Sequence, residues 1–352
     1  MIKNSISAVV FLATTLIVSA CSPIGPNGMR YNRQDYNLAL QQTNDEQLLL
    51  NLVRLRYRDT PQFIEVSSIS STFNLTLNSS VAATIKQNFS EVYNLGFSHS
   101  YAEKPTISYS PLSGEQFIQR MLSPITLDKI LLLNRSGWSS ERLFRVAIQR
   151  INQVKNALSA SGPTPNYLPE YQRFVAASKA LRALQKAGAV NLHLTGPSQQ
   201  NFVVNMQDIP ARQTFNSNLG LPDKTTHTFS TAPQTNAVHI ETRSFLGVLY
   251  YLSHAVDIPQ AHQDLGIVTI TKDHKGEVFD WRQVTQGVLN IKSSLEPPEH
   301  ASTAIQYRGY WFYIDDADLN AKSTFSLLMQ LYSLQAGNIK SSAPVLTLPV
   351  GG

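Results

Sequence analysis

The chain contains one cysteine, Cys21, so it cannot form an internal disulfide. Its fold must therefore be held together by the burial of apolar side chains. The composition allows this, because 42% of the 352 residues are hydrophobic and only 15% are charged. These proportions are typical of a globular protein and too apolar for a disordered one.

The segment that leads to Cys21 has the pattern of an export signal. Lys3 provides a positive charge, 6–18 is a short apolar run, and Ser19 and Ala20 are small residues directly before the cysteine. This pattern resembles the lipobox of bacterial lipoproteins, in which the signal is cut before the cysteine and the thiol is acylated. The resemblance implies lipidation of Cys21. An ordinary secretory signal with an incidental cysteine is the alternative.

The resemblance also implies a cellular location and a partner. Ser22 follows the cysteine where an Asp would favour retention in the inner membrane. We therefore expect an outer-membrane location on the periplasmic face, with the lipid bilayer bound through acylated Cys21. Several acyl chains on one residue would make that attachment stable.

The arrangement of apolar patterns predicts an α+β fold. We expect a helical middle region, antiparallel strands before it, and a mixed α/β C-terminal domain. The expected regions are a signal peptide (1–20), a lipidated tether (21–33), a helix plus β-hairpin region (34–111), a helical region (112–188), a loop or junction (189–237) and a C-terminal α+β domain (238–352).

The helix plus β-hairpin region has two distinct periodicities. Thr43 and Glu46 form a capping-box pattern that predicts a helix start, and the helix should stop before Pro61. Apolar and small polar residues then alternate in 73–86 and 92–101, which predicts strands. The ordinary interpretation is a sheet with one face on a core. The alternative is a hairpin that inserts in the membrane, which requires an oligomer.

Helical and strand patterns continue with less regularity toward the C-terminus. Helices are expected at 113–122, 127–133, from Ser139, 171–186, 245–252 and 325–334. Strands are expected at 202–204, 266–271, 288–291, 304–314 and 345–350, with a turn at 273–276. Most of 207–234 has little periodicity and predicts a long loop.

Positive charge is concentrated in one part of the sequence. The segment 112–188 contains eleven basic and four acidic residues, although the net charge of the whole chain is only +5. This surplus favours anionic partners such as lipid head groups, peptidoglycan carboxylates or an acidic protein, or it forms a solvated helical face. Nucleic acid is not expected, because the basic residues form no dense cluster.

Two groups of residues are candidates for binding. Asp315, Asp316 and Asp318 could bind Ca²⁺ or Mg²⁺, but the spacing of a calcium loop is missing, so backbone capping is the favoured role. Tyr310 and Trp311 belong to an aromatic run that could bind a sugar or a partner, or could pack in the core. No metal or cofactor is predicted.

No catalytic residue is assigned. The chain lacks a Gly-x-Ser-x-Gly elbow and a His-Glu-x-x-His motif, and it has no glycine-rich phosphate loop. Scattered histidines are available for a hydrolase, and these are His193, His239, His254 and His262. Such histidines are more often surface or core residues than catalytic ones.

Several segments resemble uncharacterised proteobacterial lipoproteins. They are Asn51–Tyr57, Pro105–Tyr109, Ser113–Phe117, Tyr310–Asp316 and Ser323–Leu328. The expected function is a non-catalytic, outer-membrane-anchored component of a cell-envelope assembly with protein partners. The alternatives are an oligomeric pore or export component that inserts β-hairpins, and an envelope hydrolase.

Overall fold

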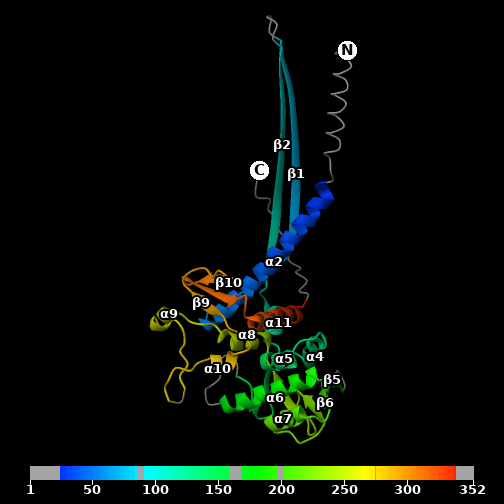
Figure 1. Ribbon diagram of the computed structural model, residues 1–352, viewed down its shortest axis with the longest axis vertical. Coiled ribbons are helices and arrows are strands. Elements are labelled where there is room, and N and C mark those ends of the chain that lie inside the picture. Colours follow the sequence, from blue (N-terminus) through cyan, green and yellow to red (C-terminus); the bar gives the residue numbers. More distant parts are fainter. Residues whose placement is uncertain (1–23, 86–90, 158–167, 197–200, 274, 338–352) are drawn as a thin grey trace. The chain divides into compact units, whose positions relative to one another are not determined.

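The computed structural model describes residues 24–85, 91–157, 168–196, 201–273 and 275–337, and it has the predicted α+β fold (Figure 1). Two compact units are present. The first comprises Met1–Pro61 and Pro124–Ser333, and the second comprises Gln62–Ser123 and Leu334–Gly352. The signal segment with Cys21, and the strand expected at 345–350, lie outside the described residues.

The first unit begins with α2 (Ile24–Arg56), a single helix that extends through much of the expected tether. The start predicted at Thr43 is wrong. The Thr43 hydroxyl donates to the carbonyl oxygens of Ala39 (2.9 Å) and Leu40 (3.1 Å) inside the helix, so it does not cap a terminus. The predicted apolar face is present, because Leu49, Leu52 and Val53 are fully buried.

The second unit contains the predicted hairpin. Strands β1 (Ile64–Ile85) and β2 (Glu91–Pro111) pair antiparallel from Ile64↔Pro111 to Ile85↔Glu91, and they form a two-stranded sheet of their own. Helix α3 (Glu115–Leu122) follows, and the rings of Phe63 and Phe117 meet edge to face at 5.6 Å. The alternation therefore predicted the pairing correctly.

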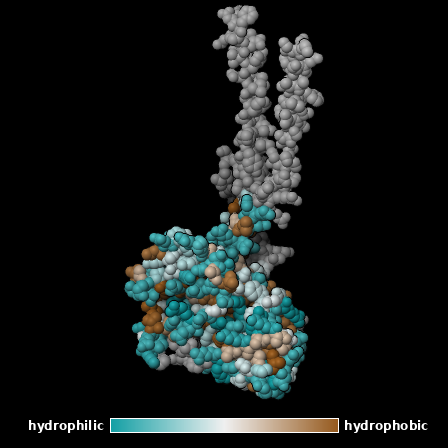
Figure 2. Space-filling model, viewed as in Figure 1, coloured by the Kyte–Doolittle hydropathy of each residue, from teal (hydrophilic) through white to brown (hydrophobic). Residues whose placement is uncertain are grey.

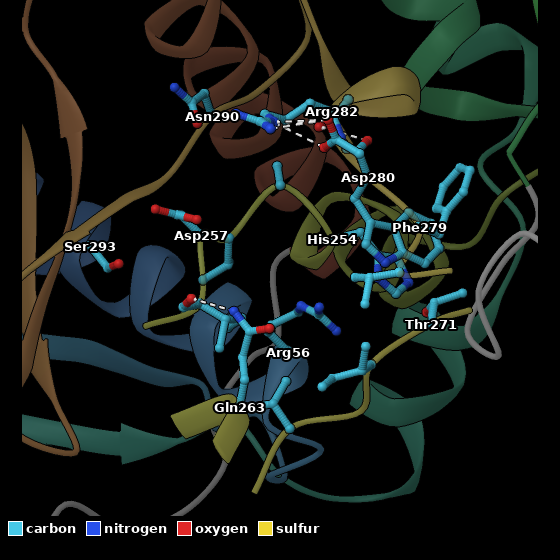
Figure 3. A pocket seen from close by; sticks show the side chains of 18 of the residues that line it. Arg56, His254, Asp257, Gln263, Thr271, Phe279, Asp280, Arg282, Asn290 and Ser293 are labelled. Atoms are coloured by element: carbon cyan, nitrogen blue, oxygen red, sulfur yellow. Dashed lines mark hydrogen bonds and ion pairs between the residues drawn. The ribbon is translucent and has the colours of Figure 1, made fainter. Parts of the chain in front are cut away.

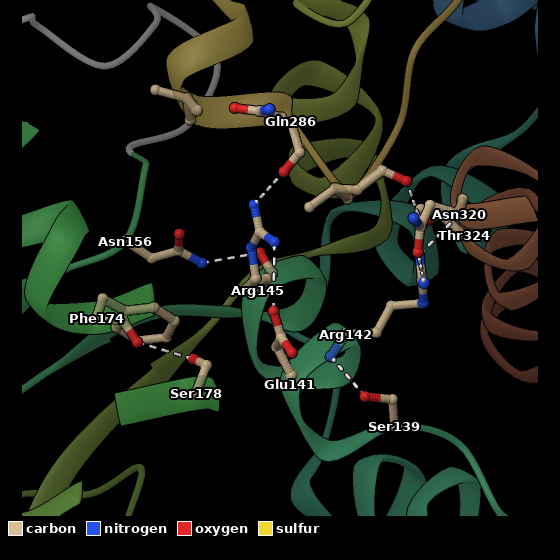
Figure 4. A network of polar contacts seen from close by, with 12 residues as sticks. Ser139, Glu141, Arg142, Arg145, Asn156, Phe174, Ser178, Gln286, Asn320 and Thr324 are labelled. Atoms are coloured by element: carbon tan, nitrogen blue, oxygen red, sulfur yellow. Dashed lines mark hydrogen bonds and ion pairs between the residues drawn. The ribbon is translucent and has the colours of Figure 1, made fainter. Parts of the chain in front are cut away.

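Three helices of the first unit match the helical middle region. They are α4 (Leu127–Arg135), α5 (Ser140–Ala147) and α6 (Leu168–Lys186). Ser139 caps α5 as predicted, with its hydroxyl accepting from the Arg142 amide at 3.4 Å. The Arg142 guanidinium reaches Asn320 and Thr324 on another helix, and these contacts fix α5 in place (Figure 4).

A six-stranded sheet corrects the prediction of a long loop. Its strands are, in spatial order, β4 (Val154–Lys155), β3 (Ile148–Ile151), β8 (Val238–Thr242), β7 (Thr226–Ser230), β6 (Asn201–Met206) and β5 (Val190–Thr195). Helix α7 (Pro210–Leu219) lies between β6 and β7 in sequence and starts with a proline. Gly220 ends the helix with φ of 64°. The proline at the start and the glycine at the end are helix signals, but the segment between them has no apolar stripe that would have predicted a helix.

The remainder of the first unit consists of helices and a small three-stranded sheet. Its elements are α8 (Phe245–Ser253), α9 (Gln260–Asp264), α10 (Arg282–Thr285), β9 (Lys292–Ser294), β10 (Ala301–Tyr307), β11 (Tyr310–Asp315) and α11 (Leu319–Ala336), whose last turn belongs to the second unit. The strand order in this sheet is β10-β11-β9. The single strand predicted at 304–314 is in fact a hairpin. Arg308 (φ 50°) and Gly309 (φ 85°) make its two-residue turn.

Two other predicted strands are absent from this part of the described chain. The segments 266–271 and 288–291 are irregular, and nearby pairing is limited to single bridges between Lys272 and Val278 and between Val256 and Ile291. The predicted turn is present, because Gly276 has φ of 83° and its amide donates to the Asp273 carbonyl at 3.0 Å. Residues 268–271 of the first segment line the cleft described below.

The surface is largely hydrophilic on the face shown in Figure 2, with small apolar patches. Among the residues that the structure describes, no helix combines the length and the apolar character needed to cross a bilayer.

Candidate functional site

The candidate site is a cleft of about 610 Å³ in the first unit (Figure 3). Its walls include the end of α2, the segment that follows α8, the irregular segments 268–271 and 278–281, and strands β9 and β11, with further residues from α9 and α10. Clefts of a few hundred cubic ångströms are the usual size for small-molecule sites. This cleft is therefore large enough to enclose a small ligand.

One wall of the cleft is a rigid aromatic stack. The rings of His254 and Trp281 lie 3.6 Å apart and nearly parallel, and Phe279 meets Trp281 edge to face at 5.2 Å. Burial, together with the nearby charge of Arg56, lowers the pKa of His254 to about 3. His254 is therefore neutral at physiological pH.

Two ion pairs neutralise charge in the cleft. The Arg282 guanidinium binds both carboxylate oxygens of Asp280, with Nε to Oδ1 at 2.9 Å, and these hydrogen bonds hold the pKa of Asp280 below its usual value. The Lys292 ammonium donates to Asp315 at 2.8 Å and likewise lowers the pKa of that carboxyl. Neither pair leaves an unmatched charge.

Arg56 and Asp257 have no such ion partner in the described part of the chain. Arg56 is half-buried, and its Nη1 donates to the Thr269 carbonyl at 3.2 Å. Its Nε is buried and has no hydrogen-bond partner. Asp257 is exposed, and its carboxylate points toward Ser293 (Figure 3). Partial desolvation of this carboxylate raises its pKa above the usual value.

The three predicted carboxylates do not form a common site. Asp315 pairs with Lys292, Asp316 pairs with the Lys322 ammonium at 2.5 Å, and Asp318 accepts from the amide of Ala321 at 2.9 Å. Among the residues that the structure describes, no group of three or more His, Cys, Asp or Glu side chains is placed to bind a metal ion.

The two predicted aromatic residues lie on β11 and are both half-buried. Tyr310 meets the ring of His262 edge to face at 4.8 Å. Trp311 is paired with Gln306 on β10 and with Ser294 on β9, in the centre of the small sheet. Neither residue lines the cleft, although Tyr313 of the same strand does.

The candidate histidines have separate partners. His262 Nδ1 contacts the Tyr57 hydroxyl at 2.6 Å, and His239 Nε2 lies 3.3 Å from Glu241. His254 is stacked on Trp281, and His193 lies on strand β5. None of these contacts is the serine–histidine hydrogen bond that a serine hydrolase requires.

Most of the cleft residues belong to no pattern that is visible in the sequence. In the sequence, Arg56 is one of three closely spaced arginines, with Arg54 and Arg58, and Asp257 lies three residues after His254. Asp280, Trp281 and Arg282 carry no recognisable motif, because their role depends on contacts with distant segments. The chain matches no protein-family model, and comparison with curated proteins and with solved structures gives no match.

Proposed function

We propose that the protein is a non-catalytic, lipid-anchored component of an outer-membrane assembly on the periplasmic face, and that the β1–β2 hairpin is its assembly element. The lipobox-like segment ending at Cys21 supports the anchor, and the resemblance to proteobacterial lipoproteins supports the class. The partners are envelope proteins, including further copies of this chain. The hairpin is the observation that carries this proposal.

Among the residues that the structure describes, no third strand pairs with the hairpin. Its strands have 22 and 21 residues and belong to a sheet of only these two strands. At about 3.4 Å per residue, the ribbon is roughly 70 Å long. A two-stranded hairpin is marginally stable alone in water, and its unpaired backbone groups form a template for another strand.

Strand β1 has few of the usual protections against edge pairing, although β2 contains Glu103, Lys104 and Pro105. From Val66 to Ile85 the sequence has no charged residue and no proline, and the register has one irregularity, between Val66 and Ser68. Natural edge strands are normally blocked by charges, prolines or bulges. Edges without these features are suited to pairing with a strand of a neighbouring molecule.

Light scattering coupled to size-exclusion chromatography tests this proposal. We expect the Cys21→Ala chain to form oligomers. A matched variant, in which Asn-Gly replaces 69–107 and joins Ser68 to Ser108, should be monomeric, because that pair is adjacent in the ladder. An oligomer that persists without the hairpin, or a monomeric parent chain with and without detergent, would refute the proposal.

An oligomeric pore or export component is the second candidate, and the register favours it. The alternations of the two strands are in phase, because Phe73, Leu75 and Leu77 pair with Glu103, Tyr101 and His99. Cross-strand partners share a face. One face thus has mainly apolar and aromatic positions and the other mainly small polar ones. Strands of 9–11 residues suffice to cross a bilayer.

A matched pair of substitutions distinguishes the pore from a purely structural assembly. Leu75→Lys places a charge on the apolar face, and Thr76→Lys places it on the polar face. In a pore, the first should abolish dye release from liposomes and the second should preserve it, because charges are costly only on the lipid-facing side. Equal effects of the two variants, or no dye release by the parent chain, would exclude the pore.

A further inference from the structure

The cleft contains a half-buried cation whose charge is not balanced. Its other cations, Arg282 and Lys292, are each bound to a carboxylate. Arg56 has no carboxylate within ion-pair distance in the described chain, and Thr269 provides only a neutral carbonyl oxygen. A buried charge without a partner is unfavourable. Burial accordingly lowers the pKa of Arg56 to about 10.

The protein keeps this cation in place nonetheless. Arg56 is the last residue of α2, where the partial negative charge of the helix end favours a cation. The neighbouring His254 cannot neutralise it, because an imidazole carries no negative charge. The stack with Trp281 holds the imidazole in position beside the cleft. The guanidinium is thus presented on a rigid wall, as a binding site requires.

We propose that the cleft binds a small ligand through one oxyanion group, a carboxylate or a phosphate, that pairs with Arg56. A guanidinium favours such groups because its N–H donors match their oxygen atoms in geometry and charge. The volume of about 610 Å³ accommodates a ligand of metabolite size. This site is independent of the hairpin, and it requires no assembly.

Other lining residues limit the rest of the ligand. The Asp257 carboxylate would repel a second anionic group, so the ligand carries its oxyanion at one end only. Ile270 and Val278 line the cleft and are 39% and 66% exposed. These two side chains offer apolar contact at the surface of the cleft. The ligand thus carries a single oxyanion group and an apolar portion.

Calorimetric titration of the full chain in detergent tests the proposal. The probes are butyrate and inorganic phosphate, at low ionic strength with chloride held constant. We expect saturable binding by the parent chain, and at least a 10-fold loss of affinity in Arg56→Gln, because a charge-assisted contact is removed. The control is Arg173→Gln, which removes an exposed cation outside the cleft, on α6, and should change affinity by less than 3-fold.

A second measurement, on the parent chain, tests the proposal even if the Arg56→Gln variant folds poorly. The ¹⁵Nε–¹H resonance of Arg56, assigned by its absence in Arg56→Lys, should shift on addition of the bound probe. Tighter binding of butyrate identifies a carboxylate ligand, and tighter binding of phosphate identifies a phosphate ligand. No binding of either probe at 50 mM, on the order of the weakest specific sites, would overturn the proposal. So would equal losses in Arg56→Gln and Arg173→Gln.

Discussion

Replacing Arg243 by Met should destabilise the first unit by about 4 kcal/mol. This side chain is 1% exposed, and its Nη1 donates to the carbonyl oxygens of Arg145 (3.0 Å), Val146 (2.9 Å) and Ile148 (3.0 Å), while Nη2 donates to Ala157. Two of these carbonyls, those of Arg145 and Val146, lie in the last turn of α5, where carbonyls have no partners within the helix.

The magnitude follows from which carbonyls lose their donor. Asn156 Nδ2 also donates to Arg145 (2.8 Å) and Ile148 (2.7 Å), so these two carbonyls keep a partner. Val146 and Ala157 lose the donor that Arg243 supplies, at about 1–3 kcal/mol for each buried group. Met has a similar volume, so little cavity cost is added. The expected total is therefore about 4 kcal/mol.

Equilibrium unfolding in urea, followed by tryptophan fluorescence of the Cys21→Ala chain, measures this change. We expect a lower midpoint with an unchanged dependence on urea, because the surface exposed on unfolding stays the same. Arg173→Met is the control, since Arg173 is exposed on α6 and its loss should cost less than about 0.5 kcal/mol. An Arg243→Met variant within about 1 kcal/mol of the parent would show that these hydrogen bonds do not stabilise α5.

Two further predictions concern pH and a turn. His254 has a folded pKa of about 3, below its value of 6.5 in the unfolded chain, so the unfolded state binds a proton first and stability should fall as the pH decreases from 6.5 toward 3. In His254→Asn, the loss of unfolding free energy between pH 7 and pH 5 should be smaller than in the parent; an equal loss would contradict this reasoning. Gly309→Val should destabilise the β10–β11 hairpin by about 1–3 kcal/mol, because φ of 85° strains a branched residue. Thermal unfolding by circular dichroism checks this, and an unchanged midpoint would exclude strain at the turn.

The sequence predicted the hairpin of the second unit because its signal is local and long. The run through Phe73, Leu75 and Leu77 has a period of two and no competing helical pattern. The antiparallel pairing and the α+β class follow from that pattern. The helices after Ser139 and Phe245 were likewise predicted, because each has a cap followed by an apolar face.

Prediction from the sequence was wrong where tertiary contacts determine the structure. Strand β7 pairs in parallel with β8, and its short, partly exposed sequence shows no clear alternation. The turn at Arg308 and Gly309 divides an aromatic run that has the pattern of one strand. The sequence contains no clear signal for this turn, because Arg is uncommon at positive φ. In both places, pairing with other segments outweighs local preference.

The hairpin and the cleft share a physical property, but only the hairpin could be predicted from the sequence. Each leaves a group without the partner that it normally has: backbone edges along β1 and β2, and a cation at Arg56. Open edges follow from a long uncharged run, which one segment of sequence displays. A cation without a counter-ion exists only once α2, His254 and the segment around Thr269 come together, so only the structure reveals it. Neither group has that partner among the residues that the structure describes, and the two can be tested separately.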